Sequence, residues 1–129
     1  NFMKTNHKKL YEIALDASKN AYCPYSDFHV GAALLTASGD VYTGVNVENS
    51  SYGATICAER SAISAAIGAG ERDFVAMAVA SPDGDATPCG ICRQVLFEFG
   101  EFIEVITGAD AEHLEAESVG ALLPKGFKL

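Results

Sequence analysis

Apolar and polar positions follow two different periods along the chain, and each period indicates one kind of secondary structure. Between residues 8 and 21, apolar side chains recur every three or four positions, which is typical of a helix with one buried face. Residues 28–36 and 41–47 are apolar and β-prone on either side of a turn that contains Gly39, which favours a β-hairpin. Residues 74–80 are continuously apolar, as in a strand that is buried on both faces of a parallel sheet.

Two further segments have the character of helices. Segment 55–69 is apolar almost all round and rich in small side chains, which predicts a buried helix, and a second helix is predicted from residue 89 to about residue 99. A strand at 102–107 and a short helix at 119–123 complete the prediction, with a polar segment at 108–118 between them. Strands that alternate with buried helices indicate an α/β fold, in which a mixed sheet is sandwiched between helices.

The length of the chain and its N-terminal residues set limits on its organisation. A chain of 129 residues can build one hydrophobic core but not two, so we expect a single domain over residues 1–129. No apolar run approaches the ~20 residues of a membrane span, and residues 1–7 are polar, unlike a secretory signal. These features predict a cytoplasmic protein without a membrane segment.

The charge balance limits the partners. The chain has 17 acidic and 9 basic residues, with a formal net charge of −8. A protein that binds a polyanion needs Lys and Arg side chains to replace the counterions that binding releases. We therefore expect no nucleic-acid partner, which disfavours a polynucleotide-editing enzyme, and we expect a small neutral molecule as substrate.

Three of the four cysteines lie at the starts of two predicted helices. Cys57 begins the helix at 55–69, and Cys89 and Cys92 open the helix that follows the strand at 74–80. Unpaired N–H groups at a helix start favour thiolates, and the spacing of Cys89 and Cys92 places both thiols on one helical face. Zinc prefers four tetrahedral ligands, so three cysteine ligands leave one position for water or substrate. This pattern predicts one catalytic zinc ion per chain.

Glu59 lies two residues after Cys57 and is not needed as a ligand. A carboxylate in that place can take a proton from a zinc-activated water and pass it to a leaving group. The same combination of residues is the known signature of zinc nucleobase deaminases. A thioredoxin-like interpretation of the pair Cys89 and Cys92 leaves Cys57 and Glu59 without a role, so we rank it below zinc.

Several polar residues have two interpretations each. Asn46 and Glu48 share one face of their strand, either as a solvent-facing edge or as polar groups in a pocket that hold hydroxyls. Arg60 is predicted to donate hydrogen bonds to the cysteine thiolates and so to offset their negative charge, while Arg93 has no preferred role. Cys23 is predicted to be a small buried residue, with a fourth zinc ligand as the alternative. The three histidines are predicted to lie on the surface, because no pair of them has metal-ligand spacing.

The sequence resembles the small, three-cysteine cytidine deaminases of the homotetrameric kind over nearly its whole length. The resemblance implies a three-layer α/β/α sandwich around a mixed, mostly five-stranded sheet, a zinc cofactor, and the deamination of free cytidine and deoxycytidine in pyrimidine salvage. It also implies a homotetramer whose active sites are shared between subunits. The motifs that carry it are YSDFHVGAA (25–33), NVEN (46–49), CAER (57–60), PCGICRQ (88–94) and LLP (122–124) with Phe127.

The resemblance also implies roles for individual residues. Cys57, Cys89 and Cys92 would bind zinc, and Glu59 would shuttle protons. The substrate contacts would be Phe28 on the base, the backbone of Ala58 on the pyrimidine edge, Asn46 and Glu48 on the ribose 3′-hydroxyl, and Tyr52 and Phe127 in the pocket of a neighbouring subunit.

Two rival functions share the zinc motifs. A deaminase for an aminonucleoside antibiotic or for a nucleotide should lack the polar pair Asn46 and Glu48, or should add basic residues for a phosphate. A structural zinc module without enzymatic activity would need a fourth protein ligand such as Cys23.

Overall fold

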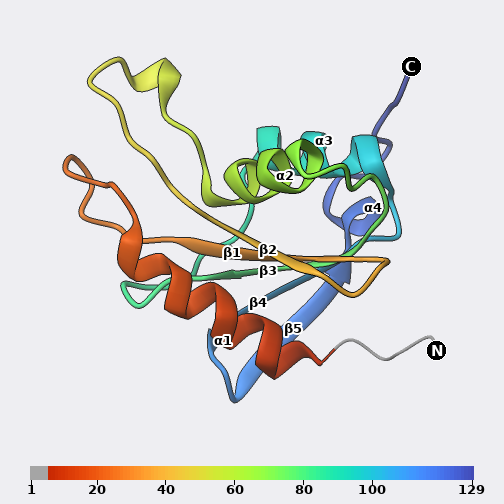
Figure 1. The fold of residues 1–129 in the computed structure, drawn as a ribbon, viewed down its shortest axis with the longest axis horizontal. Coiled ribbons are helices and arrows are strands. Elements are labelled where there is room, and N and C mark those ends of the chain that lie inside the picture. Colours follow the sequence, from red (N-terminus) through yellow and green to blue (C-terminus); the bar gives the residue numbers. More distant parts are fainter. Residues whose placement is uncertain (1–5) are drawn as a thin grey trace.

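The computed structural model describes residues 6–129, which form a five-stranded sheet with helices on both faces (Figure 1). The sheet is mixed, because some neighbouring strands run parallel and others antiparallel. In chain order the elements are α1 (His7–Ala17), a 3₁₀ turn (Ser18–Asn20), β1 (Gly31–Thr36), β2 (Val41–Val45), a 3₁₀ turn (Tyr52–Ala54), α2 (Ala58–Gly68), β3 (Phe74–Ala80), α3 (Gly90–Phe99), β4 (Glu104–Asp110), β5 (His113–Ser118) and α4 (Val119–Leu122).

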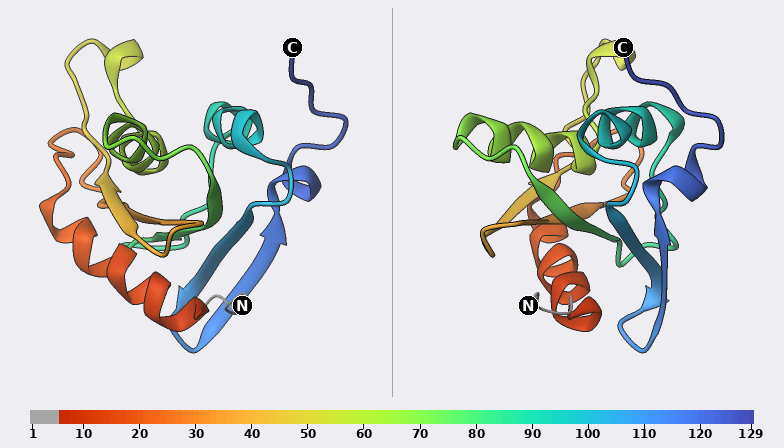
Figure 2. Two further views of the ribbon diagram at one scale, coloured as in Figure 1. Left: turned by 45° about the vertical axis from the view of Figure 1, so that its right-hand side comes forward. Right: turned by 90° about the vertical axis from the view of Figure 1, so that its right-hand side faces the viewer.

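The strands lie in the order β2-β1-β3-β4-β5. The central strand β3 is antiparallel to β1 and parallel to β4, so the parallel pairing predicted for residues 74–80 holds on one side only. Helix α1 covers one face of the sheet, and α2 and α3 cover the opposite face (Figures 1 and 2). The predicted three-layer α/β/α fold is therefore confirmed. No helix within residues 6–129 combines the length and the apolar character that crossing a bilayer requires.

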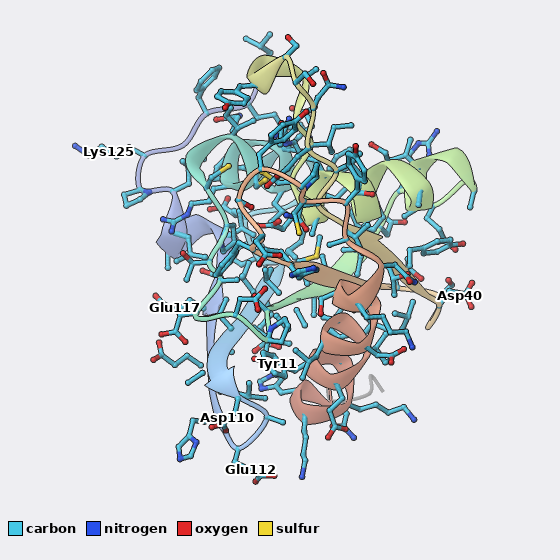
Figure 3. The ribbon with its side chains drawn as sticks, turned by 90° about the vertical axis from the view of Figure 1, so that its left-hand side faces the viewer. Tyr11, Asp40, Asp110, Glu112, Glu117 and Lys125 are labelled. Atoms are coloured by element: carbon cyan, nitrogen blue, oxygen red, sulfur yellow. The ribbon has the colours of Figure 1, made fainter. Side chains whose placement is uncertain are left out.

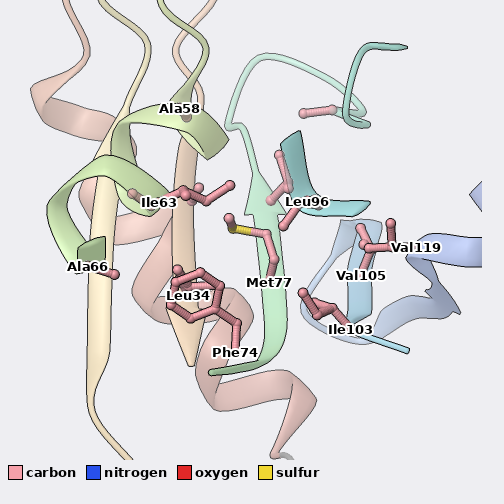
Figure 4. Packing of buried hydrophobic residues seen from close by; sticks show 14 residues of the cluster. Leu34, Ala58, Ile63, Ala66, Phe74, Met77, Leu96, Ile103, Val105 and Val119 are labelled. Atoms are coloured by element: carbon pink, nitrogen blue, oxygen red, sulfur yellow. The ribbon is translucent and has the colours of Figure 1, made fainter. Parts of the chain in front are cut away.

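Alternation along the strands divides the core into two clusters, one on each face of the sheet. On β3, Met77 and Val79 belong to the cluster beneath α2 and α3, while the alternating alanines 76, 78 and 80 belong to the cluster on the side of α1. Figure 4 shows Met77 beside Ile63 from α2 and Leu96 from α3. Both helices that carry the predicted zinc ligands are thus packed on one side of the sheet.

One strand was not predicted. The segment from His113 to Ser118, which the sequence indicated only as polar, pairs with β4 as the antiparallel edge strand β5. Its hydrophobic alternation is weak, since Glu115, Ala116 and Glu117 are all exposed, and Glu117 points outward in Figure 3. Charged side chains are common on edge strands, where they discourage pairing with another chain. The prediction missed β5 because most of its residues are polar and exposed, so the segment has no clear alternation of apolar and polar positions.

Several predicted boundaries also shift. The helix predicted to reach residue 21 ends at Ala17 and continues as a 3₁₀ turn, and the strand predicted from residue 28 begins at Gly31. The second strand ends at Val45 instead of residue 47. Val47 instead forms isolated bridges, parallel with Tyr22 and antiparallel with Ile56. These bridges lead the chain out of the sheet into the projecting segment before α2 (Figure 1).

Close contact between β2 and α2 depends on Gly44. A Cβ atom at this position would lie 2.3 Å from the backbone nitrogen of Ala62 and 2.5 Å from the carbonyl oxygen of Ala58. Because backbone atoms of a helix cannot rotate away, we expect Gly44→Ala to lower the free energy of unfolding by about 3 kcal/mol. Denaturant titration measures this loss. The control is Gly68→Ala at the end of α2, where a Cβ atom meets nothing within 4 Å; equal stability of the two variants would contradict the prediction.

Candidate metal centre and adjoining pocket

The three predicted zinc ligands come together where α2 and α3 begin. Cys57 is the N-cap residue of α2, Cys89 is the N-cap residue of α3, and Cys92 lies in the first turn of α3. Neither N-cap side chain makes the hydrogen bond to its own helix that Ser or Asp makes at this position. Their sulfur atoms are instead grouped with that of Cys92, and all three lie within 4.8 Å of one another.

The spacing of these sulfur atoms fits a tetrahedral metal ion. Zn–S bonds of about 2.3 Å at tetrahedral angles place neighbouring sulfur atoms about 3.8 Å apart. The Sγ atoms of Cys57 and Cys89 are 3.9 Å apart. Within residues 6–129, this is the one group of at least three potential ligands that could hold a metal ion, and it does not include Cys23. The residues therefore fit a zinc ion with three protein ligands.

Electrostatics favour a thiolate at this centre. A hydrogen bond from Cys92 and another from Arg60 lower the pKa of Cys57 to about 5, against the opposing effect of burial. The pKa of Cys92 is raised because its thiol donates to Cys57 and because it is buried. Arg60 Nη2 lies 3.5 Å from Cys57 Sγ. The first proton to be lost thus belongs to Cys57, and binding of a metal ion by the three cysteines would require the loss of the remaining thiol protons.

Glu59 is the buried carboxyl group of this region. Its side chain lies in the first turn of α2 and is only 4% exposed. Burial raises the pKa of Glu59 to about 7, and the negative charge of Cys57 acts in the same direction. A carboxyl group with this pKa exists in both protonation states near neutral pH. It can therefore accept and donate a proton in one reaction cycle.

A pocket of about 330 Å³ opens beside Glu59 and the cysteines. Its volume is in the range of small-molecule sites. Of the residues predicted to contact substrate or metal, those that line it are Phe28, Asn46, Cys57, Ala58, Glu59 and Cys89.

Asn46 lies in the pocket wall, and its side chain also bonds the backbone of the segment that precedes β1. Its Oδ1 accepts a hydrogen bond from the backbone N–H of Val30 at 3.0 Å, and its Nδ2 donates to the carbonyl oxygen of Phe28 at 2.8 Å. The amide thus fixes the backbone on both sides of residue 29. It is not a free solvent-facing group.

Glu48 is outside this wall. Its Oε1 accepts the backbone N–H groups of Tyr25 and Ser26, at 3.0 and 3.1 Å, and its carboxylate also accepts the Ser26 hydroxyl. The hydroxyl is the main cause that lowers the pKa of Glu48. The carboxylate is therefore held in its ionised form beside the loop that precedes Phe28.

The two residues predicted to reach a neighbouring subunit lie away from the pocket. Tyr52, in the projecting segment before α2, is 77% exposed, and Phe127 is 66% exposed. The side chain of Gln94 donates to the carbonyl oxygen of Phe127 at 3.2 Å, which holds the tail near α3. Both aromatic rings are thus accessible on the surface of the single chain.

Three features of the site were not predicted from the sequence. Arg93 joins the loop before Cys89 to the C-terminal region, since its Nε donates to Pro88 at 2.8 Å and its Nη1 donates to Leu122 at 2.9 Å. His29 pairs with Asp83, and Asp85 lines the pocket. These residues lie in loops or make contacts far along the chain, where no short spacing indicates a role.

Comparison with known proteins gives consistent matches. Residues 4–109 match the family described as "Cytidine and deoxycytidylate deaminase zinc-binding region". A Dictyostelium discoideum protein named "Probable cytidine deaminase" is 48% identical over 122 residues, which are 93% of this chain and 82% of that protein. The cytidine deaminase of Sporosarcina psychrophila is 45% identical over 123 residues, 93% of this chain and 90% of that protein. The crystal structure of cytidine deaminase from Burkholderia pseudomallei is similar with a TM-score of 0.88 and 45% identity, over 95% of this chain and 100% of that chain.

Proposed function

Because the chain belongs to the cytidine and deoxycytidylate deaminase family, we propose that it hydrolyses free cytidine and deoxycytidine to uridine and deoxyuridine, with release of ammonia. The observation that carries this proposal is the buried carboxyl group of Glu59 next to three converging cysteines at one pocket wall. The alternative of a structural zinc module is weaker, because a fourth protein ligand is missing from the cysteine group among residues 6–129.

Cys57, Cys89 and Cys92 would hold the zinc ion. When bound, zinc lowers the pKa of a water molecule from ~15.7 to about 7 and so supplies a nucleophile at neutral pH. In the reaction, water adds to C4 of the cytosine ring, its oxygen remains as the C4 carbonyl, and the 4-amino group leaves as ammonia. Glu59 takes one proton from the water to N3 and carries the second to the departing nitrogen. The pKa of about 7 suits both transfers.

Arg60 would support this centre from outside the metal ligands. Three thiolates on one zinc ion give a net charge of −1, which weakens the ion as a Lewis acid. The guanidinium group that donates to Cys57 Sγ offsets this excess.

The substrate contacts are proposed from the pocket walls. Phe28 packs on the base, and the backbone of Ala58 bonds the pyrimidine edge at the start of α2. The ribose 3′-hydroxyl donates its proton to the ionised carboxylate of Glu48 and accepts a hydrogen bond from the side-chain amide of Asn46. Support for this assignment comes from the place of Asn46 in the pocket wall and from the carboxylate of Glu48 two residues beyond it.

The charge of the pocket favours a nucleoside over a nucleotide. In the described part of the chain, the pocket has the carboxyl groups of Glu59 and Asp85 in its wall and no Lys or Arg side chain. A phosphate would face like charge without a counter-ion. We expect kcat/KM for cytidine 5′-monophosphate to be about 100-fold below that for cytidine, as measured by parallel rate assays. Comparable values for the two would favour a nucleotide deaminase, and activity only on an aminonucleoside antibiotic would favour the other rival.

The direct test of the proposal is the loss of cytidine absorbance on mixing with the purified protein, with zinc analysis of the same sample. Fast conversion with one zinc ion per chain is the expected result. Stoichiometric zinc without conversion of cytidine or deoxycytidine would contradict the proposed activity and leave the metal site in place.

We further propose a homotetramer in which Tyr52 and Phe127 complete the pocket of a neighbouring subunit. Support comes from the exposure of both rings, 77% and 66%, on the single chain. Light scattering of the purified protein gives the subunit number. A cytoplasmic role in pyrimidine salvage is proposed because all four cysteines are free thiols, which is usual for proteins of the reducing cytosol.

A further inference from the structure

One residue pair fastens the loop between β3 and α3 to the start of β1. Asp83 Oδ2 accepts two hydrogen bonds from the same residue, one from the backbone N–H of His29 at 2.8 Å and one from its Nδ1 at 2.9 Å. The backbone N–H of Asp83 in turn donates to Ser81 Oγ at 3.0 Å. Asp83 is therefore held through its side chain by His29, 54 positions away, and through its backbone by Ser81.

The loop held in this way forms one wall of the pocket. Its residues Asp85, Ala86 and Thr87 line the pocket, and it leads directly into Cys89. At Gly84, the position of a Cβ atom would lie 3.4 Å from the ring of Phe28, so the loop backbone packs against that ring. Phe28 precedes His29 in the chain. The pair thus joins the loop to the aromatic side chain proposed to hold the base.

We propose that His29 and Asp83 are positioning residues, which hold the loop of residues 81–88 against Phe28 and thereby set the width of the substrate pocket. The inference rests on the proposed function for its effect on substrate. Neither side chain lines the pocket, so both act through the loop and through Phe28.

The charges around the pair support this role. The hydrogen bond to Asp83 raises the pKa of His29, with a further contribution from the negative charge of Asp27. The hydrogen bonds from the backbone and then the side chain of His29 lower the pKa of Asp83. The two side chains are only 34% and 36% exposed, so water screens their attraction less than it does for a fully exposed pair.

Steady-state kinetics on variants test the proposal. His29→Ala removes one of the two hydrogen bonds and Asp83→Ala removes both, so we expect KM for cytidine to rise roughly tenfold in the second and less in the first. Because Glu59 and the cysteines are untouched, kcat and zinc content should change little. His29→Asn keeps an N–H donor near the carboxylate and should restore most of the lost affinity.

The chain offers a matched control pair. His113 Nδ1 lies 2.8 Å from Asp110 Oδ1, and that same carboxylate oxygen accepts the backbone N–H of Glu112. This pair has similar chemistry but lies at the far end of the β4–β5 hairpin, away from α2 and α3 (Figures 2 and 3). His113→Ala should therefore leave KM unchanged.

Hydrogen–deuterium exchange of residues 84–87 supplies a readout that needs no turnover. Faster exchange in Asp83→Ala than in the parent protein is expected, with no change in His113→Ala. Unchanged exchange and unchanged KM in both His29→Ala and Asp83→Ala would overturn the inference. If Asp83→Ala does not fold, the comparison of His29→Ala with His29→Asn decides. Absence of turnover in the parent protein would refute the proposed function alone, and the exchange data would still decide the role of the pair.

Discussion

Glu59→Gln is expected to lower kcat by about 100-fold or more while the protein keeps its zinc. Glutamine has the same size and suits the same buried position, where the native side chain is 4% exposed. Its amide, however, can neither take a proton from water nor deliver one to the ring and the leaving amine. Initial rates of cytidine conversion measure the loss, and metal analysis of the same sample establishes that the cysteine site is intact.

The matched control for this variant is Glu98→Gln, which makes the same chemical change at an exposed position of α3. Its kcat should equal that of the parent protein, because Glu98 is exposed and does not line the pocket. Near-normal turnover of Glu59→Gln with full zinc occupancy would remove Glu59 from the acid–base role. Another group would then have to transfer the protons from water to the ring and to the leaving amine.

The convergence of the three cysteines and the place of Glu59 beside them could be predicted because both depend on residues that are close together in the sequence. Cys57 and Glu59 are two residues apart, and Cys89 and Cys92 are three apart, so each pair has one orientation once its helix begins. The raised pKa of Glu59 depends on burial, which the apolar character of residues 55–69 already indicated. Short spacing and one buried helix were therefore sufficient to predict that these side chains lie close together.

The supporting contacts could not be predicted in this way. His29 and Asp83 are 54 positions apart and meet only because β1 and β3 are neighbours in the sheet. The sequence prediction placed His29 on the surface and named no partner for it. Arg93 had no preferred role, although it bonds the carbonyl groups of Pro88 and Leu122, because both of these acceptors belong to the backbone. Backbone acceptors leave no residue-type signal in a sequence.

The same distinction, between local sequence patterns and long-range backbone contacts, explains which elements of the fold were predicted and which were missed. Strand β3, which is buried on both faces, and helix α1, which is buried on one face, have strong apolar patterns and were predicted close to their observed positions. Strand β5 was missed because its pairing with β4 satisfies the backbone without a strong apolar pattern. The end of β2 at Val45 was also missed, since Val47 remains β-prone but bridges to Tyr22 and Ile56 outside the main sheet.

Loss of one cysteine ligand should abolish metal binding and activity together. We expect Cys89→Ala to bind zinc more than about 100-fold more weakly. Removal of a residue that only hydrogen-bonds a metal ligand already lowers metal affinity by about 10–100-fold, and removal of a ligand itself should lower it further. Two remaining thiolates cannot complete the site, and Cys89 also lines the pocket. Competition with a chromophoric chelator measures zinc affinity, and the cytidine assay of the same sample should fall to background.

Cys23→Ala is the control that separates a catalytic centre from a structural one. Cys23 is 6% exposed and lies outside the group of three converging sulfur atoms, so its replacement should leave zinc stoichiometry and kcat unchanged. A structural site with four cysteine ligands would instead lose zinc in this variant and would have no open position for water. Circular dichroism spectra of both variants establish whether a variant that loses zinc is still folded. Zinc loss from a folded Cys23→Ala protein would show that Cys23 is a fourth ligand and that the metal is structural. If Cys89→Ala loses zinc and Cys23→Ala keeps it, the site has three protein ligands, and its fourth position is open for the water on which Glu59 acts.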